Sequence, residues 1–285
     1  MNVGAEAVSQ RSVRDSRWER WEGRLRERLE KGDLELPPLP DIAQRAMAMA
    51  RDESTSAADL AELMNRDAAL ASALLRRANS VALGAATRVA SAHQAVARLG
   101  MREASEIAVA VSLRAGLFQG QVYPTLANRI WRQSLASGLF AKEVMRSMGR
   151  DIEIAFLCGL LADVGQPMVL NELGATTRAY ERPDEETAAS LARALGPQFA
   201  ATAVRSWALP GVVIESIMRR DEEPSEESRV ASLGQRLAEI VVDPEAEIAD
   251  FEADPDAVAL CLEPQEIARV IAQADRIREE TEGMP

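Results

Sequence analysis

Histidine is almost absent from this chain, since His93 is the single imidazole in 285 residues. Sites that hold a metal ion with several histidines are therefore excluded by inventory. The two cysteines, Cys158 and Cys261, lie far apart and lack the spacing of metal ligands. We expect both to be small buried apolar residues without a redox role, His93 to lie on the surface, and no cofactor to be used.

Aromatic residues are also scarce, at 4% of a chain that is 47% hydrophobic, so smaller apolar residues must fill the core, which favours packed helices. Basic residues are outnumbered, with 33 Lys and Arg against 45 Asp and Glu, and the net charge of −12 makes nucleic acid an unfavourable partner. No apolar run reaches the roughly 18 residues of a membrane span, and the N-terminus is polar. We therefore expect a cytoplasmic protein without membrane insertion.

The segment between residues 8 and 31 predicts an amphipathic helix. Its apolar residues recur at steps of three and four, at Trp18, Trp21, Leu25 and Leu29. Such a stripe covers an apolar surface of the same chain, of a partner protein or of a membrane, and the glutamates among its arginines weaken the membrane option. We interpret residues 1–33 as an N-terminal docking helix.

Residues 34–240 predict an all-α unit of two lobes, about 34–120 and 121–240. The proline-rich stretch Leu36–Pro40 cannot be helical and leads into the first lobe. N-cap residues then indicate a series of short helices, which begin at Ser56, Asp67 and Ser91.

Three further features shape this unit. Asn79, at the end of a leucine-rich helix, is expected to satisfy free carbonyls, to adopt a left-handed turn and to lock one lobe to the other. The run after Asp151 is apolar nearly all round, as in a central helix. Gly196-Pro197 and Leu209-Pro210 are interpreted as helix breaks.

The C-terminal part, residues 241–285, is interpreted as an acidic linker and a last helix. Asp243 to Asp256 contains seven acidic residues and no basic ones. From Pro264 onward one helix is expected, with Ile267, Ile271 and Ile277 along one face as a second candidate docking surface.

Several motifs, taken in order, resemble the HDOD domain of bacterial signalling proteins. They are Leu36–Pro40, Asp67, Leu74–Ser80, Ala95–Gly100, Trp131–Ser134, Ala155–Gly165 and Trp207–Pro210. The resemblance covers about residues 34–240 and implies a two-lobed helical bundle, with flanking helices in this chain. HDOD domains are similar in fold to HD-type metal phosphohydrolases, but are thought generally to lack the catalytic metal centre.

This chain departs from the hydrolase pattern at the metal ligands. Gln133 stands where a histidine follows Trp-Arg, Ala162 and Asp163 replace His-Asp, Arg220-Asp221 replaces a histidine pair, and a later aspartate falls near Gln235. Only Asp163 remains as a ligand, which is too few for a water-activating metal. The resemblance therefore implies a protein that is not an enzyme.

The degenerate cleft is still a candidate ligand site. Asp163 and Gln133 could organise a pocket beside Ala162, with Arg219 or Arg220 as an anion-binding fork. The alternative is structural: Asp163 caps or bridges helices, and the two arginines lie on a solvated face.

The functional prediction that follows from the resemblance is a non-enzymatic regulatory adaptor. Its expected partners are signalling proteins, namely a kinase, a response regulator or a cyclic-dinucleotide enzyme, and assembly with further copies of itself stays open. The alternative is a pseudo-enzyme that senses a nucleotide or cyclic dinucleotide in the degenerate cleft without hydrolysis.

Overall fold

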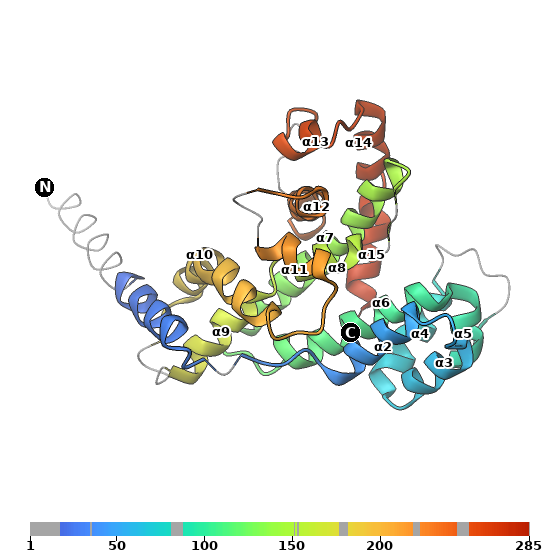
Figure 1. The fold of residues 1–285 in the computed structure, drawn as a ribbon, viewed down its shortest axis with the longest axis horizontal. Helices are drawn as coiled ribbons and strands as arrows, with labels where there is room; N and C mark the ends of the chain where they lie inside the picture. Colours follow the sequence, from blue (N-terminus) through green and yellow to red (C-terminus); the bar gives the residue numbers. More distant parts are fainter. Residues whose placement is uncertain are drawn as a thin grey trace, which may run out of the picture.

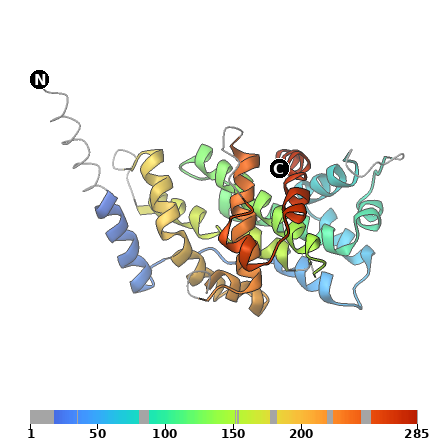
Figure 2. The same ribbon diagram turned by 90° about the horizontal axis from the view of Figure 1, so that it is seen from above.

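The computed structural model describes residues 18–34, 36–80, 88–150, 152, 154–176, 182–218, 223–243 and 251–284. Within these ranges every regular element is a helix and no strand occurs, which confirms the all-α prediction. The molecule is elongated, with the N-terminal helix (residues 18–31) and helices α2–α5 at opposite ends (Figure 1, Figure 2). No helix in the described ranges has both the length and the apolarity to cross a bilayer.

The N-terminal lobe consists of α2 (Asp41–Arg51), α3 (Ala57–Asn65), α4 (Ala68–Ala78), α5 (Ala92–Leu99) and α6 (Met101–Leu113). Side-chain caps fix where three of these helices begin. Ser56 forms a capping box with Asp59, Asp67 accepts from the N–H groups of the first turn of α4, and Ser91 accepts from the N–H of Gln94. The three predicted helix starts are therefore confirmed.

Asn79 closes the end of α4. Its Nδ2 donates to the carbonyls of Leu75 and Val89 at 2.9 and 2.8 Å, and its Oδ1 accepts from the N–H of Val89 at 2.8 Å. The prediction that it satisfies a free carbonyl is confirmed. The left-handed turn and the lock between lobes are wrong, because φ is −103° and both partners lie in the N-terminal lobe.

The C-terminal lobe follows a π-helical turn, η2 (Arg114–Phe118). It consists of α7 (Pro124–Ser147), α8 (Ala155–Leu161), α9 (Gly165–Thr176), α10 (Glu185–Val204), α11 (Gly211–Met218) and α12 (Glu226–Val242). All seven residues of α8 are buried, which confirms a central helix after Asp151. Helix α6 belongs to both cores, because Ile107 packs in the N-terminal cluster and Val109 in the C-terminal one.

The proline-rich stretch before α2 is extended, as expected, and is held by a residue of the C-terminal lobe. Leu39 is buried, and the indole N–H of Trp207 donates to the carbonyl of Pro37 at 3.2 Å. Trp207 lies just before Leu209-Pro210, which separates α10 from α11 as predicted. The two motifs are therefore packed together across 170 residues.

The break predicted at Gly196-Pro197 is wrong, because α10 continues through it. Proline has no N–H to bond the carbonyl of Arg193, but its φ is compatible with a helix, and Leu195 and Phe199 are fully buried on either side. Helix α9 packs closely against α10 at this point because of Gly165, where a Cβ would lie 1.9 Å from the Gly196 carbonyl oxygen.

The C-terminal part contains α13 (Pro255–Ala259), α14 (Pro264–Ile271) and α15 (Ala274–Gly283). The single last helix predicted from Pro264 is wrong, because a turn at residues 272–273 lets α15 run along α7 to the N-terminal lobe (Figure 1). Cys261, in the turn after α13, is exposed, contrary to the prediction that both cysteines are buried.

The acidic segment is more structured than a linker where it is described. Asp254 caps α13 and accepts two hydrogen bonds from Arg236 of α12, at 2.5 and 2.7 Å. Arg236 also binds Asp256 at 2.7 Å. These carboxylates are ordered because arginines on α12 neutralise them; residues 244–250 lie outside the described ranges.

Candidate functional site

An open cleft of about 800 Å³ lies in the C-terminal lobe. Side chains from α7, α9, α10, α11 and α12 and from the turn before α9 line it. The lining residues that bear on its chemistry are Arg129, Gln133, Ala162, Asp163, Gln166, Arg193, Ile217, Met218, Gln235 and Glu239. A volume of this size is in the range of small-molecule sites.

Three of the predicted site residues share this cleft. Asp163 and Ala162 lie in the turn between α8 and α9, and Gln133 projects from α7. Asp163 accepts a hydrogen bond from Gln166 at 2.8 Å, and Gln133 donates to the carbonyl of Gln235 at 3.0 Å. The first bond orients the carboxylate, and the second joins α7 to α12 across the floor.

The other two predicted residues, Arg219 and Arg220, lie outside the described ranges. Three arginines that the prediction missed line the cleft instead, namely Arg129, Arg193 and Arg236, of which Arg236 binds Asp254 and Asp256. Arg129 and Arg193 are exposed and have no ion-pair or hydrogen-bond partner among the described residues. Helical spacing gave one signal, because Arg129 precedes Gln133 by four residues on the same helix face.

The rest of the lining divides by chemistry. Ile130, Ile217 and Met218 form an apolar part, and Met218 is 39% exposed. Glu239 and Asp243 place negative charge at the α12 side. The cleft therefore offers free cationic groups, one oriented carboxylate and an apolar contact in one space.

Metal ligands are few in the part of the chain that the structure describes. No group of three or more His, Cys, Asp or Glu residues there could hold a metal ion. His93 is exposed on α5, in the other lobe, as predicted. Cys158 is buried in α8, and that burial raises the pKa of its thiol to about 12.

The two predicted docking surfaces are used within the chain. Trp21 and Leu25 are buried in the main core, and Arg28 beside them binds Glu172 of α9 at 3.0 Å. Ile267 and Ile277 are buried against α7 and α12. Trp18, Leu29 and Ile271 are partly buried in the same packing. The buried members of both sets are therefore covered by intramolecular contacts, and binding of a partner through the partly buried members stays a prediction.

Comparison with protein families assigns this architecture. The model of the HDOD domain matches residues 36–223, which is most of the chain and includes the cleft as far as α11. The chain belongs to the HDOD family. The resemblance predicted from ordered motifs is thereby confirmed.

Two solved structures have the fold of this HDOD protein. One is a candidate metal-dependent phosphohydrolase from Shewanella amazonensis SB2B, with a TM-score of 0.70 and 20% identity over 93% of this chain and 99% of that one. The other is an HDOD domain protein with unknown function from Geobacter sulfurreducens, with a TM-score of 0.67 and 18% identity over 92% and 99%. At this identity the likeness shows the fold alone.

A sequence relative comes from Treponema pallidum (strain Nichols), an uncharacterized protein that is 24% identical over 192 residues. The match covers 64% of this HDOD chain and 37% of the relative's length. HDOD membership and the fold fit a regulatory role.

Proposed function

We propose that this chain is a regulatory HDOD protein that binds a small anionic ligand in the cleft and does not hydrolyse it. One observation carries the proposal: the cleft is open, at about 800 Å³, although the positions of the hydrolase metal ligands hold Gln133 and Ala162. A cleft that had lost all function would be free to fill with side chains, as the rest of the core is filled.

The ligand class follows from the lining. Arg129 and Arg193 carry fixed positive charge without partners in the described part, and guanidinium groups bind phosphate or carboxylate through paired hydrogen bonds. Ile217 and Met218 offer an apolar surface, and Asp163 accepts hydrogen bonds. A phosphate ester with a flat, hydrogen-bonding organic part, such as a nucleotide or cyclic dinucleotide, satisfies all three.

Absence of hydrolysis is proposed from the donor set. Asp163 is the one hydrolase ligand that this chain retains at its position, and the chain's single imidazole, His93, lies on α5. A divalent metal that activates water is usually held by three protein ligands. Binding without turnover is the chemistry that remains.

Thermal denaturation tests ligand binding. Millimolar GMP, and separately cyclic di-GMP, should raise Tm with a concentration dependence that follows RT ln(1 + [L]/Kd). Arg193→Gln, Arg129→Gln and Asp163→Ala should each remove most of the rise, whereas Arg205→Gln, an exposed arginine beyond the end of α10, should keep it. No rise with either probe, or a rise that all variants retain, overturns the proposal.

Assays with added Mn²⁺, Fe²⁺ or Zn²⁺ test the absence of catalysis. We expect no metal-dependent cleavage of a phosphate ester or cyclic dinucleotide. Turnover that requires the metal and disappears in Asp163→Ala would show a working hydrolase instead.

The adaptor role predicted from the sequence is part of the same proposal. A sensor without chemistry passes on its state through contact with a signalling protein, such as a kinase, a response regulator or a cyclic-dinucleotide enzyme. Purified candidates of each class can be titrated with the chain by calorimetry, with and without the cleft ligand. Affinity for none of them, in either state, would contradict the adaptor role and leave ligand binding untouched.

A further inference from the structure

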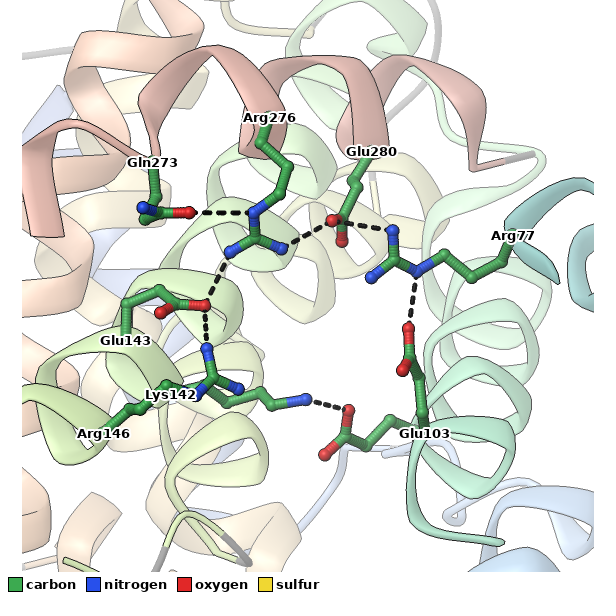
Figure 3. A network of polar contacts seen from close by, with 9 residues as sticks. Arg77, Glu103, Lys142, Glu143, Arg146, Gln273, Arg276 and Glu280 are labelled. Carbon is green, nitrogen blue, oxygen red and sulfur yellow. Dashed lines mark hydrogen bonds and ion pairs between the residues drawn. The ribbon is translucent and has the colours of Figure 1, made fainter. Parts of the chain in front are cut away.

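Helix α15 connects the two lobes through charged side chains (Figure 3). Arg276 binds Glu143 of α7 at 2.6 Å, and Glu280 binds Arg77 of α4 at 2.8 Å. Arg276 and Glu280 also bind each other, at 2.7 Å. A continuous series of ion pairs therefore runs from the C-terminal lobe through α15 to the N-terminal lobe.

Backbone carbonyls at the end of α15 extend these contacts. Arg76 donates to the carbonyl of Gly283 at 3.1 Å, and Arg114 of η2 donates to that of Met284 at 2.8 Å. The last carbonyls of a helix have no partner within the helix, so cationic donors are well placed there. On the other side, Arg278 donates to the carbonyl of Ile240 in α12 at 3.0 Å.

Four of the groups that α15 contacts also have partners that do not belong to α15, whereas Arg132 of α7 binds only Glu282 of α15, at 3.4 Å, among the described residues. Arg77 binds Glu103 at 2.5 Å, and Glu143 pairs with Arg146. Arg76 bonds the hydroxyl of Ser72 at 2.5 Å, and Arg114 bonds Asn128 at 3.2 Å. The main cost of breaking a buried ion pair is the unpaired charge left behind. When α15 departs, these four groups therefore keep a partner, and Arg276 and Glu280 still pair with each other.

Helix α15 buries fewer apolar residues for its length than the helix before it. Its ten residues bury Ile277 and Thr281, whereas the eight residues of α14 bury Ile267 and Val270, and Met284, directly after α15, packs against both cores. The turn at residues 272–273 separates the two helices. α14 thus has the larger share of buried apolar residues, and the bonds that α15 forms with the side chains of α4 are polar.

A further ion pair joins the lobes independently of α15. Lys142 of α7 binds Glu106 of α6 at 2.5 Å, with 12% and 11% of the two side chains exposed. Burial raises the pKa of Glu106, and the charge of Lys142 opposes that rise. This pair keeps α6 against α7 whether or not α15 is bound.

We propose that α15 is a releasable clamp: it detaches at residues 272–273 while α14 stays bound, and its departure releases α4 of the N-terminal lobe from α7 and α12. The lobes then remain joined through α6, η2 and the Lys142–Glu106 pair. The proposal is independent of what the cleft binds.

Hydrogen exchange on the full chain tests the clamp. The double variant Arg276→Glu/Glu280→Arg keeps the pair within α15, but places a carboxylate opposite Glu143 and a guanidinium opposite Arg77. We expect the amides of α15 to exchange about 10-fold faster or more, since two pairs become repulsive, and those of α8 to be unchanged. In the unmodified chain, about 0.5 M NaCl should speed exchange in α15 in the same selective way.

The control is the same exchange of charges at an exposed pair, Glu62→Arg/Arg66→Glu, in the last turn of α3 and directly after it, whose side chains are 68% and 58% exposed. It should leave α15 unaffected. The proposal is overturned if α15 and α8 accelerate together in the swapped variant, or if α15 keeps its protection there and in salt. The salt experiment decides if the variant does not fold.

Discussion

At the scale of single residues, Gly165 cannot be replaced by a larger residue without a backbone clash. Its Cβ would meet the Gly196 carbonyl oxygen at 1.9 Å and the Ala200 nitrogen at 2.6 Å, and both are backbone atoms that cannot rotate away. Gly165→Ala should lower the free energy of unfolding by about 3 kcal/mol, the upper part of the range for overpacking. Urea denaturation measures it. Gly211→Ala, where nothing lies within 4 Å, should change stability little, and equal losses in both would contradict the explanation.

Asp254 gives a dependence on pH. Burial raises the pKa of its carboxyl, but hydrogen bonds from Arg236 and from backbone N–H groups outweigh burial, so the pKa lies below its ordinary value in the folded chain. The unfolded chain then binds more protons, and stability from this group is present above about pH 4 and lost as pH falls through the folded pKa.

Asp254→Asn should therefore cost about 1–3 kcal/mol between pH 5 and 7, as for hydrogen bonds to a charged group, and progressively less below about pH 4. Urea denaturation between pH 3 and 7 measures the difference. Asp275→Asn, whose carboxylate is 92% exposed, should show only a small difference. An Asp254→Asn deficit that is as large at pH 3 as at pH 7 would refute the assignment.

Residue roles that depend on near neighbours in the sequence could be predicted. Ser56, Asp67 and Ser91 cap helices because the N–H groups they bind lie two or three residues away. Arg193 of the cleft could not, because it lies 60 residues beyond Gln133 and only the folding of α7 and α10 around one cleft brings the two residues together. A local pattern carries no information about such a meeting.

At the scale of elements, the N-terminal helix is a stabilising part of the C-terminal lobe. Trp21 is 6% exposed and packs in the main core, so Trp21→Ala should lower the free energy of unfolding by about 3–5 kcal/mol. Trp18→Ala, at a partly buried position of the same helix, should cost less. Chemical denaturation compares them, and a Trp21→Ala chain of unchanged stability would restore the docking interpretation.

Helix starts and the central apolar helix were predictable, whereas two helix boundaries were not. Gly196-Pro197 has the composition of a break, yet α10 passes through it because Leu195 and Phe199 gain more by burial than one backbone bond costs. The turn at residues 272–273 has no proline or glycine to announce it. Tertiary packing decided both cases.

At the scale of the whole molecule, the two lobes should unfold together. Helix α6 contributes residues to both cores, so neither core survives without it. All four tryptophans pack in or against the C-terminal core, so their fluorescence reports that lobe, while far-UV circular dichroism reports every helix. The two signals should give one urea midpoint. A dichroism midpoint clearly below the fluorescence midpoint would show that the lobes are separate units.

The overall architecture was predictable from ordered motifs, because their order and spacing resemble those of the HDOD domain, and two of the motifs are in contact through the bond from Trp207 to Pro37. The cleft's openness was not, because it depends on which side chains turn inward. The ion pairs of α15 with Arg77 and Glu143 were not predictable either, because in the sequence these charged residues look like parts of solvent-exposed helix faces.

The two thiols differ in accessibility, so their labelling rates can report the opening of the C-terminal lobe. Cys261 is exposed after α13, and Cys158 is enclosed in α8, where burial raises its pKa to about 12 and suppresses the reactive thiolate. A thiol-labelling reagent will modify Cys261 at once and Cys158 only when the centre of the C-terminal lobe opens. The delay between labelling of Cys261 and labelling of Cys158, followed by mass spectrometry, therefore measures how often that opening occurs in the unaltered protein.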